Sequence, residues 1–349
     1  MPKYKIAFFD SKEYDITSFN RINSDKYSIT YFDVLLNKDT VVLSKGFDAV
    51  CAFVNDKIDK DVIDKLEEYN IKVLALRCAG YNNVDVKYAY KKVHILTVPG
   101  YAPEAIAEHA FALITSLSRH THKAYNRVRD FNFSLNGLTG FNLKGKTIGI
   151  IGTGKIGRVM IDIANGYSMN VLAYDLFPDK NLNCAYVSLD ELYKRSDIIS
   201  LHAPLTDANY HMINRDSISL MKDGVIIINT SRGGLINSLD LLDGLRSKKI
   251  GGAGLDVYEE ESDVFFIDKS LEGIDDQTLS LLISMPNVIV TSHQAYLTKE
   301  ALEEIAKTTI DNLDKTLNGE FTPNEICYMC KEKKDIPECL NNRKNICWK

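Results

Sequence analysis

Three side chains of types suited to carbonyl reduction each follow an apolar run typical of a buried strand: Arg232, Glu261 and His293. A guanidinium binds a carboxylate through paired hydrogen bonds. An imidazole titrates near neutral pH and can give a proton to a carbonyl oxygen. A carboxylate beside that imidazole favours its charged form and fixes its tautomer. If the three converge, they meet the needs of 2-oxo acid reduction.

Each of these residues also has an ordinary structural explanation. An arginine at a strand end is commonly a solvated or capping residue, and Glu261 belongs to the acidic run Glu259–Glu261, which is typical of a wet loop. Most of the 7 histidines are expected to be structural or exposed. His202 also follows a predicted strand, so a position after a strand does not by itself select His293.

A glycine-rich segment, Gly152-x-Gly154-x-x-Gly157, directly follows a predicted strand and opens a predicted helix. The first glycine makes the tight turn, the second lets a pyrophosphate approach the backbone, and the third allows close helix–strand packing. Such a pattern alone is also typical of any tight strand–helix turn. Asp175 lies about 20 residues further on, where a carboxylate accepts hydrogen bonds from an adenine ribose and repels a 2′-phosphate. The sequence therefore predicts NAD rather than NADP.

The elements that must position these residues are short Val/Ile/Leu/Ala runs that alternate with segments of helical spacing. Continuous apolar runs are typical of parallel strands covered by helices on both faces, so the fold class is predicted as α/β. The predicted strands are Lys5–Phe9, Ala49–Val54, Lys72–Leu76, His94–Val98, Thr147–Ile151, Asn170–Tyr174, Asp197–Leu201, Val225–Asn229, Gly252–Val257 and Asn287–Thr291.

One long predicted helix separates these strands into two sets, and a second follows the last strand. The first is predicted over Pro103–Val128, where Pro103 suits a first helical turn, and the second over Thr298–Leu317. The chain is therefore predicted to form two doubly wound parallel-sheet domains.

Composition excludes several classes of protein. The net charge of −5 gives no sign of a nucleic-acid-binding surface. The longest apolar run, Ala49–Val54, is far shorter than the roughly 18 residues of a membrane span, and Ile6–Phe9 is too short for a signal peptide. With 7 cysteines, an odd count, and no mark of secretion, we expect a cytoplasmic protein with reduced thiols.

Beyond these patterns, the sequence resembles the D-isomer-specific 2-hydroxyacid dehydrogenases, from about Lys5 to Ile326. Within that family it is most similar to members that convert pyruvate and D-lactate. The stretches that carry the resemblance are Leu76–Asn83, Val98–His109, Gly152–Gly157, Asn229–Gly234, Leu255–Glu261 and Ser292–Tyr296. The last three are the most distinctive.

The resemblance implies a role for each catalytic candidate. Arg232 would bind the substrate carboxylate and carbonyl, His293 would be the acid/base, and Glu261 would be its partner. Tyr101 and Tyr296 would line the substrate pocket, together with backbone N–H groups around Ala79 and Gly80. Further residues would surround NAD: Lys155, Ile156, Asp175, Ala203, Pro204, Asn209, Thr230, Ser231 and Asp256.

The resemblance also implies a Rossmann-type NAD domain, residues 102–297, inserted into a flavodoxin-like substrate domain, residues 1–101 and 298–330. The expected activity is NADH-dependent reduction of pyruvate to D-lactate. Two alternatives stay open, namely a related enzyme for larger 2-oxo acids and a redox-sensing, corepressor-like binding protein on the same scaffold. We expect a small-molecule substrate, no nucleic-acid or membrane partner, and a homodimer or higher homo-oligomer that pairs through the helix after Pro103.

The tail of residues 331–349 lies beyond the resemblance. Cys327, Cys330, Cys339 and Cys347 are numerous enough to bind zinc, but their spacing lacks a second C-x-x-C pair. A redox pair or a set of inert thiols explains them equally. We expect no metal and a dispensable, poorly ordered tail, because its Lys, Asn and Arg residues offer little to bury.

Overall fold

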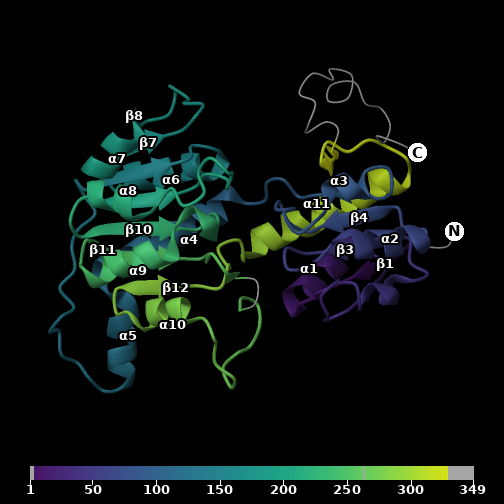
Figure 1. Ribbon diagram of the computed structural model, residues 1–349, viewed down its shortest axis with the longest axis horizontal. Helices are drawn as coiled ribbons and strands as arrows, with labels where there is room; N and C mark the ends of the chain where they lie inside the picture. The colour runs from purple at the N-terminus through teal and green to yellow at the C-terminus, as the bar shows by residue number, and fades with distance from the viewer. Residues whose placement is uncertain (1–3, 262–263, 329–349) are drawn as a thin grey trace. The chain divides into compact units, whose positions relative to one another are not determined.

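The computed structural model describes residues 4–261 and 264–328, so the prediction for the tail lies outside the described residues. The chain divides into two compact units (Figure 1). The terminal unit combines the stretch that ends at Ala102 with the stretch that begins at Thr298, and the middle unit is Pro103–Leu297. Among the described residues, no helix is long and apolar enough to cross a membrane.

The terminal unit is built on a six-stranded sheet in the order β13-β5-β4-β3-β1-β2. Five strands are parallel, in the order typical of a flavodoxin-like fold, and β13 joins β5 antiparallel at one edge. The strands are β1 (Lys5–Phe8), β2 (Ser28–Tyr31), β3 (Ala49–Ala52), β4 (Val73–Leu76), β5 (His94–Leu96) and β13 (Glu325–Ile326). The helices are α1 (Glu13–Asn23), η1 (Val41–Ser44), α2 (Lys60–Glu68), α3 (Val86–Ala89) and α11 (Lys299–Leu317).

The middle unit is built on a seven-stranded, wholly parallel sheet in the order β12-β11-β10-β9-β6-β7-β8. The strands are β6 (Thr147–Ile151), β7 (Asn170–Tyr174), β8 (Ala185–Tyr186), β9 (Ile198–Leu201), β10 (Val225–Asn229), β11 (Ile250–Leu255) and β12 (Val288–Val290). The helices are α4 (Pro103–Arg119), α5 (Thr121–Arg129), α6 (Lys155–Gly166), α7 (Leu189–Arg195), α8 (Arg215–Leu220), η2 (Gly233–Leu235), α9 (Ser238–Arg246) and α10 (Gln277–Ser284). From β6 the strand order runs through β7 to β8 at one edge, and the chain then returns to the other side of β6 to form β9. In open α/β sheets, ligands bind at such a switch point, which here lies between β6 and β9.

The α/β class and the two parallel sheets agree with the sequence prediction, but three strands were not predicted. In β2, exposed and half-buried residues alternate, so no apolar run marks it. The other two, β8 and β13, have only two residues each. All three lie at or next to a sheet edge, where helices cover less of the strand.

The prediction of one helix over Pro103–Val128 is wrong. His120 has a left-handed backbone (φ 53°), and it separates α4 from α5. The carbonyl oxygen of Ser118, near the end of α4, accepts a hydrogen bond at 3.0 Å from the N–H of Phe141. This later segment takes the place that the next helical turn would fill, and so the helix ends.

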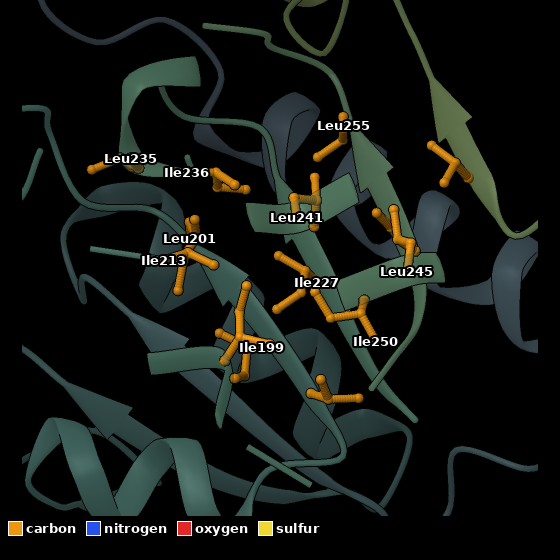
Figure 2. Packing of buried hydrophobic residues seen from close by; sticks show 14 of the residues in the cluster. Ile199, Leu201, Ile213, Ile227, Leu235, Ile236, Leu241, Leu245, Ile250 and Leu255 are labelled. Atoms are coloured by element: carbon orange, nitrogen blue, oxygen red, sulfur yellow. The ribbon is translucent and has the colours of Figure 1, made fainter. Parts of the chain in front are cut away.

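Buried aliphatic side chains hold the strand ends of the middle unit in place. Figure 2 shows Leu241 and Leu245 of α9 in one cluster with Ile227 of β10 and Ile250 of β11. On the other side of the same sheet, α4 and α6 pack their own buried residues. The carboxyl ends of β9, β10 and β11 are thus rigid supports for the loops that follow them.

Candidate active site

Arg232 lies on a short loop that leaves the end of β10. The buried side chain of Asn229 closes this loop, because it accepts from the N–H of Ser231 (3.0 Å) and donates to the carbonyl of Arg232 (2.8 Å). Ser231 Oγ also donates to the carbonyl of Ala203 at 2.6 Å, which ties the loop to the one after β9. The guanidinium is half-buried and donates one N–H to the Ser231 carbonyl at 2.7 Å. The loop therefore presents a positioned cation at the strand end.

Glu261 lies on the loop that follows β11. One of its carboxylate oxygens accepts from the N–H of Tyr258 at 3.0 Å, and the other lies 2.9 Å from Nδ1 of His293. Gly233, which follows the arginine, packs directly on the Tyr258 carbonyl, where a Cβ atom would overlap the oxygen. The loops that carry Arg232 and Glu261 are therefore in contact.

His293 has a left-handed backbone with φ 53°, which is uncommon for a residue other than glycine. Because an ionised carboxylate only accepts, Nδ1 carries the proton shared with Glu261. The other ring nitrogen, Nε2, is thereby left for proton exchange with a substrate. The ring of Phe266, another residue with positive φ (66°), lies 6.0 Å from the imidazole between ring centroids.

Asp256 is fully buried behind the loop that carries His293. Its carboxylate accepts from Thr291 Oγ1 (2.5 Å), the Gln294 N–H (2.9 Å) and the Ala295 N–H (2.8 Å). Its carbonyl accepts from the His293 N–H at 2.7 Å. Burial by itself raises the pKa of this carboxyl, but the hydrogen bonds that it accepts outweigh burial and lower the pKa.

The glycine-rich turn after β6 has the geometry that a dinucleotide requires. Gly152 has φ 94°, and Gly157 packs so closely that a Cβ atom there would overlap the Gly152 carbonyl oxygen. Apart from Gly154 and its immediate chain neighbours, no heavy atom of the described residues lies within 4 Å of a Cβ atom placed at Gly154, so the backbone is open to a ligand at this point. The amides of Lys155 and Ile156 begin α6 with no side-chain cap. Together these features fit the pyrophosphate of a dinucleotide.

A cavity of about 430 Å³ continues from this turn. Four predicted cofactor residues line it together with Gly152: Asp175, Ala203, Pro204 and Asn209. Asn209 also shapes the cavity wall, because its amide donates to the Pro204 carbonyl at 2.7 Å.

The side chain of Asp175 lines this cavity and is held in place by hydrogen bonds. It accepts from the N–H of Thr153 (2.6 Å) and from the N–H of Phe177 (2.8 Å). Burial opposes ionisation, yet these amide hydrogen bonds outweigh it and lower the pKa of Asp175. The carboxylate is therefore ionised at neutral pH. A negative charge here would repel the 2′-phosphate of NADP, and the role of Asp175 in selecting the cofactor stays a prediction.

The remaining predicted site residues are placed as follows. Ala79 and Gly80 are half-buried on the loop after β4 in the terminal unit, and Tyr101 follows β5 there. Tyr296 is buried in the middle unit, three residues after His293. Thr230 is buried at the end of β10. For these residues the substrate and cofactor roles stay predictions.

Sequence reasoning missed three residues that support the site. His109 and Thr291 contact Asp256, and Phe266 lies against His293. His109 and Thr291 lie at the ends of stretches already singled out, Val98–His109 and Asn287–Thr291. Phe266 has no such signal, because it lies in the apolar run Val264–Ile267, which is typical of ordinary core packing.

Comparison with known proteins decides the family. Residues 111–295 match the family model described as D-isomer specific 2-hydroxyacid dehydrogenase, NAD binding domain. The D-lactate dehydrogenase of Escherichia coli (strain K12) is 46% identical over 327 residues, which cover 92% of this chain and 99% of the relative. The chain belongs to the D-isomer specific 2-hydroxyacid dehydrogenase family.

Solved structures agree with this assignment. The pyruvate reductase of Chlamydomonas reinhardtii superposes with a TM-score of 0.87 at 41% identity, covering 90% of this chain and 97% of that chain. A D-lactate dehydrogenase from Aquifex aeolicus, solved with NAD and lactic acid, gives a TM-score of 0.78 at 33% identity, covering 90% and 96%. This member of the 2-hydroxyacid dehydrogenase family is therefore an NAD-dependent enzyme with a Rossmann NAD-binding domain.

Asp175→Ser should narrow the preference for NADH over NADPH about tenfold, because it removes a charge that repels the 2′-phosphate, and about 1.4 kcal/mol corresponds to a factor of ten. Fluorescence titration of both cofactors measures the ratio of dissociation constants. Asp162→Ser, which removes an exposed carboxylate from α6, serves as the control and should leave the ratio unchanged. An unaltered ratio in Asp175→Ser would show that the ribose is held elsewhere.

Proposed function

We propose that this enzyme reduces pyruvate to D-lactate with NADH, and that it catalyses the reverse reaction. The observation that supports this most directly is the 2.9 Å contact of His293 Nδ1 with Glu261, because it orients Nε2 as the acid/base atom. The arginine loop packs against the loop of Glu261. An anion-binding group and a proton donor thus lie on neighbouring loops of the same unit.

The proposed reaction assigns one role to each catalytic residue. The guanidinium of Arg232 binds the carboxylate and polarises the carbonyl of the 2-oxo acid. His293 donates its Nε2 proton to the carbonyl oxygen as the alcohol forms. Glu261 stabilises the imidazolium before that transfer and keeps Nδ1 protonated after it. NADH, when bound, supplies the hydride that reduces the carbonyl carbon.

The cofactor and substrate contacts complete the proposal. Gly152, Gly154 and Gly157, with the first amides of α6, would hold the pyrophosphate, and Asp175 would accept the adenine ribose hydroxyls. Further cofactor contacts are proposed for Lys155, Ile156, Ala203, Pro204, Asn209, Thr230 and Ser231. Asp256, the remaining predicted contact, has no exposed surface, so we propose that it acts through the loop that it holds rather than by touching the cofactor. Ala79, Gly80, Tyr101 and Tyr296 are proposed to contact the substrate, with pyruvate favoured over larger 2-oxo acids.

Steady-state rates with NADH and pyruvate, phenylpyruvate or 2-oxoisocaproate test the substrate. We expect pyruvate to have the highest kcat/KM, and chiral chromatography to identify the product as D-lactate. A higher kcat/KM for either larger acid would contradict the pyruvate assignment. Negligible rates on all three would favour a binding protein on this scaffold.

His293→Asn should lower kcat by about 10² or more, since general acid catalysis contributes at least that factor, while NADH binding is retained. His120→Asn is a matched control, because His120 has the same backbone φ of 53° and asparagine tolerates that conformation. It should retain the kcat of the wild type. Near-normal turnover in His293→Asn would remove this residue from the mechanism.

We also propose that the enzyme is a homo-oligomer. The apolar sequence of α4 suggested that this helix forms the interface, but its packing gives less support for that. Its apolar residues, such as Ala110 and Ile114, pack into the core of their own unit. Large apolar side chains are instead exposed on α5 and the segment after it, where Phe131, Phe133 and Leu135 are at least 70% exposed. Exposed apolar patches of this kind mark association surfaces, so this segment is the better candidate for contact with a second copy.

Light scattering at micromolar concentration should report at least twice the chain mass for the wild type. Phe131→Ser combined with Phe133→Ser should shift it toward the monomer, because the apolar contact is lost. Leu271→Ser removes one fully exposed leucine from a distant position in the sequence and should leave the mass unchanged. A monomeric wild type would refute the proposal.

A further inference from the structure

The way α4 packs on β11 has a repeating register. A Cβ atom at Gly252 would lie 3.5 Å from Leu117, and one at Gly254 would lie 3.0 Å from Leu113. Four helical residues rise about 6 Å, and two strand residues about 6.6 Å. Because these two lengths nearly match, a residue four positions earlier on α4 lies against a residue two positions later on β11. The glycines leave room for the helix to approach closely.

The next pair in this register is His109 on α4 and Asp256 just beyond β11. Nε2 of His109 lies 3.5 Å from the Asp256 carboxylate and 3.1 Å from Oγ1 of Thr291. The hydroxyl of Thr291 has one proton, which it donates to Asp256 at 2.5 Å. Its oxygen must then accept from His109, so Nε2 of His109 carries a proton.

This contact lies directly behind the catalytic loop. Thr291 is the first residue after β12, and His293 follows two residues later. The Asp256 carbonyl accepts from the His293 N–H (2.7 Å), while the carboxylate accepts from the next two amides of the loop. The donor on His109 therefore completes the hydrogen bonding around the carboxylate and hydroxyl that hold the left-handed backbone of His293.

We propose that His109 is a positioning residue of the reaction: its Nε2–H orients Thr291 and Asp256, and through them sets the position of the His293 imidazole. This inference rests on the proposed function, since it requires His293 to be the acid/base. In this role, the side chain of His109 acts by donating one N–H to Thr291 and Asp256, and not merely by filling space.

Four variants test this role: His109→Leu, His109→Gln, Thr291→Val and the double variant His109→Leu/Thr291→Val. Glutamine places an N–H near the position of Nε2, whereas leucine fills a similar volume without a donor. The measurement is the single-turnover rate of NADH oxidation by pyruvate in a stopped-flow instrument, with the NADH dissociation constant measured alongside.

We expect His109→Leu to slow the single turnover about tenfold or more, as small displacements of catalytic groups do, with the NADH dissociation constant within about twofold of wild type. His109→Gln should retain most of the rate. Thr291→Val should resemble His109→Leu, and the double variant should be no slower than the slower single variant, because both changes disrupt the same contact.

Three results would overturn the proposal: a wild-type rate in His109→Leu, equal losses in the Leu and Gln variants, or losses that multiply in the double variant. If His109→Leu does not fold, His109→Asn replaces it, since its shorter amide does not reach Thr291 and the same loss is expected. A wild type that reduces no 2-oxo acid would instead refute the proposed function, which keeps the two failures distinct.

Discussion

The loop that carries His293 depends on one buried, ionised carboxylate. An isolated charge in a protein interior costs several kcal/mol unless donors surround it. Asp256 has no exposed surface, and it meets this requirement by accepting from a hydroxyl and two consecutive amides of the loop after β12. These hydrogen bonds fix how the loop closes on the carboxylate, and this closure holds His293 in a backbone conformation that is otherwise unfavourable.

The wholly parallel sheet explains why the other groups lie nearby. Parallel strands end at the same edge, so the loops after β9, β10, β11 and β12 emerge side by side. The carbonyl of Ala203 and the side chain of Ser231 join the first two loops, while Gly233 and Tyr258 join the second and third. Residues far apart in sequence thus form one connected surface next to the dinucleotide turn.

Much of this arrangement could be predicted from the sequence, because buried parallel strands are continuous apolar runs and the glycine turn has a spacing set by its ligand. Elements at the sheet edge, such as β2, carry no such pattern. The end of α4 before His120 depends on a hydrogen bond from Phe141, which lies 21 residues further along the chain. The local sequence around His120 gives no sign of it. Asp256 was predicted as a cofactor contact from resemblance alone. Its burial follows only from the closure of the loop.

The contact of His109 with Thr291 also could not be predicted from the local sequence. The motif that contains His109 was recognised, but the contact arises from the register of a helix on a strand. That register depends on Gly252 and Gly254, more than 140 residues further along the chain. Sequence spacing gives the faces of each element, whereas their alignment is a property of three-dimensional packing.

The most direct test of this account is the hydride-transfer step in Asp256→Asn, followed by stopped-flow absorbance of NADH with pyruvate. Asparagine keeps the shape of the side chain but removes the charge around which the loop closes. We predict that the folded variant, verified by its circular dichroism, transfers hydride about 10²-fold more slowly while its NADH dissociation constant stays within about threefold of wild type. A wild-type rate of hydride transfer, or a loss of NADH affinity with that rate preserved, would contradict the central role of this carboxylate.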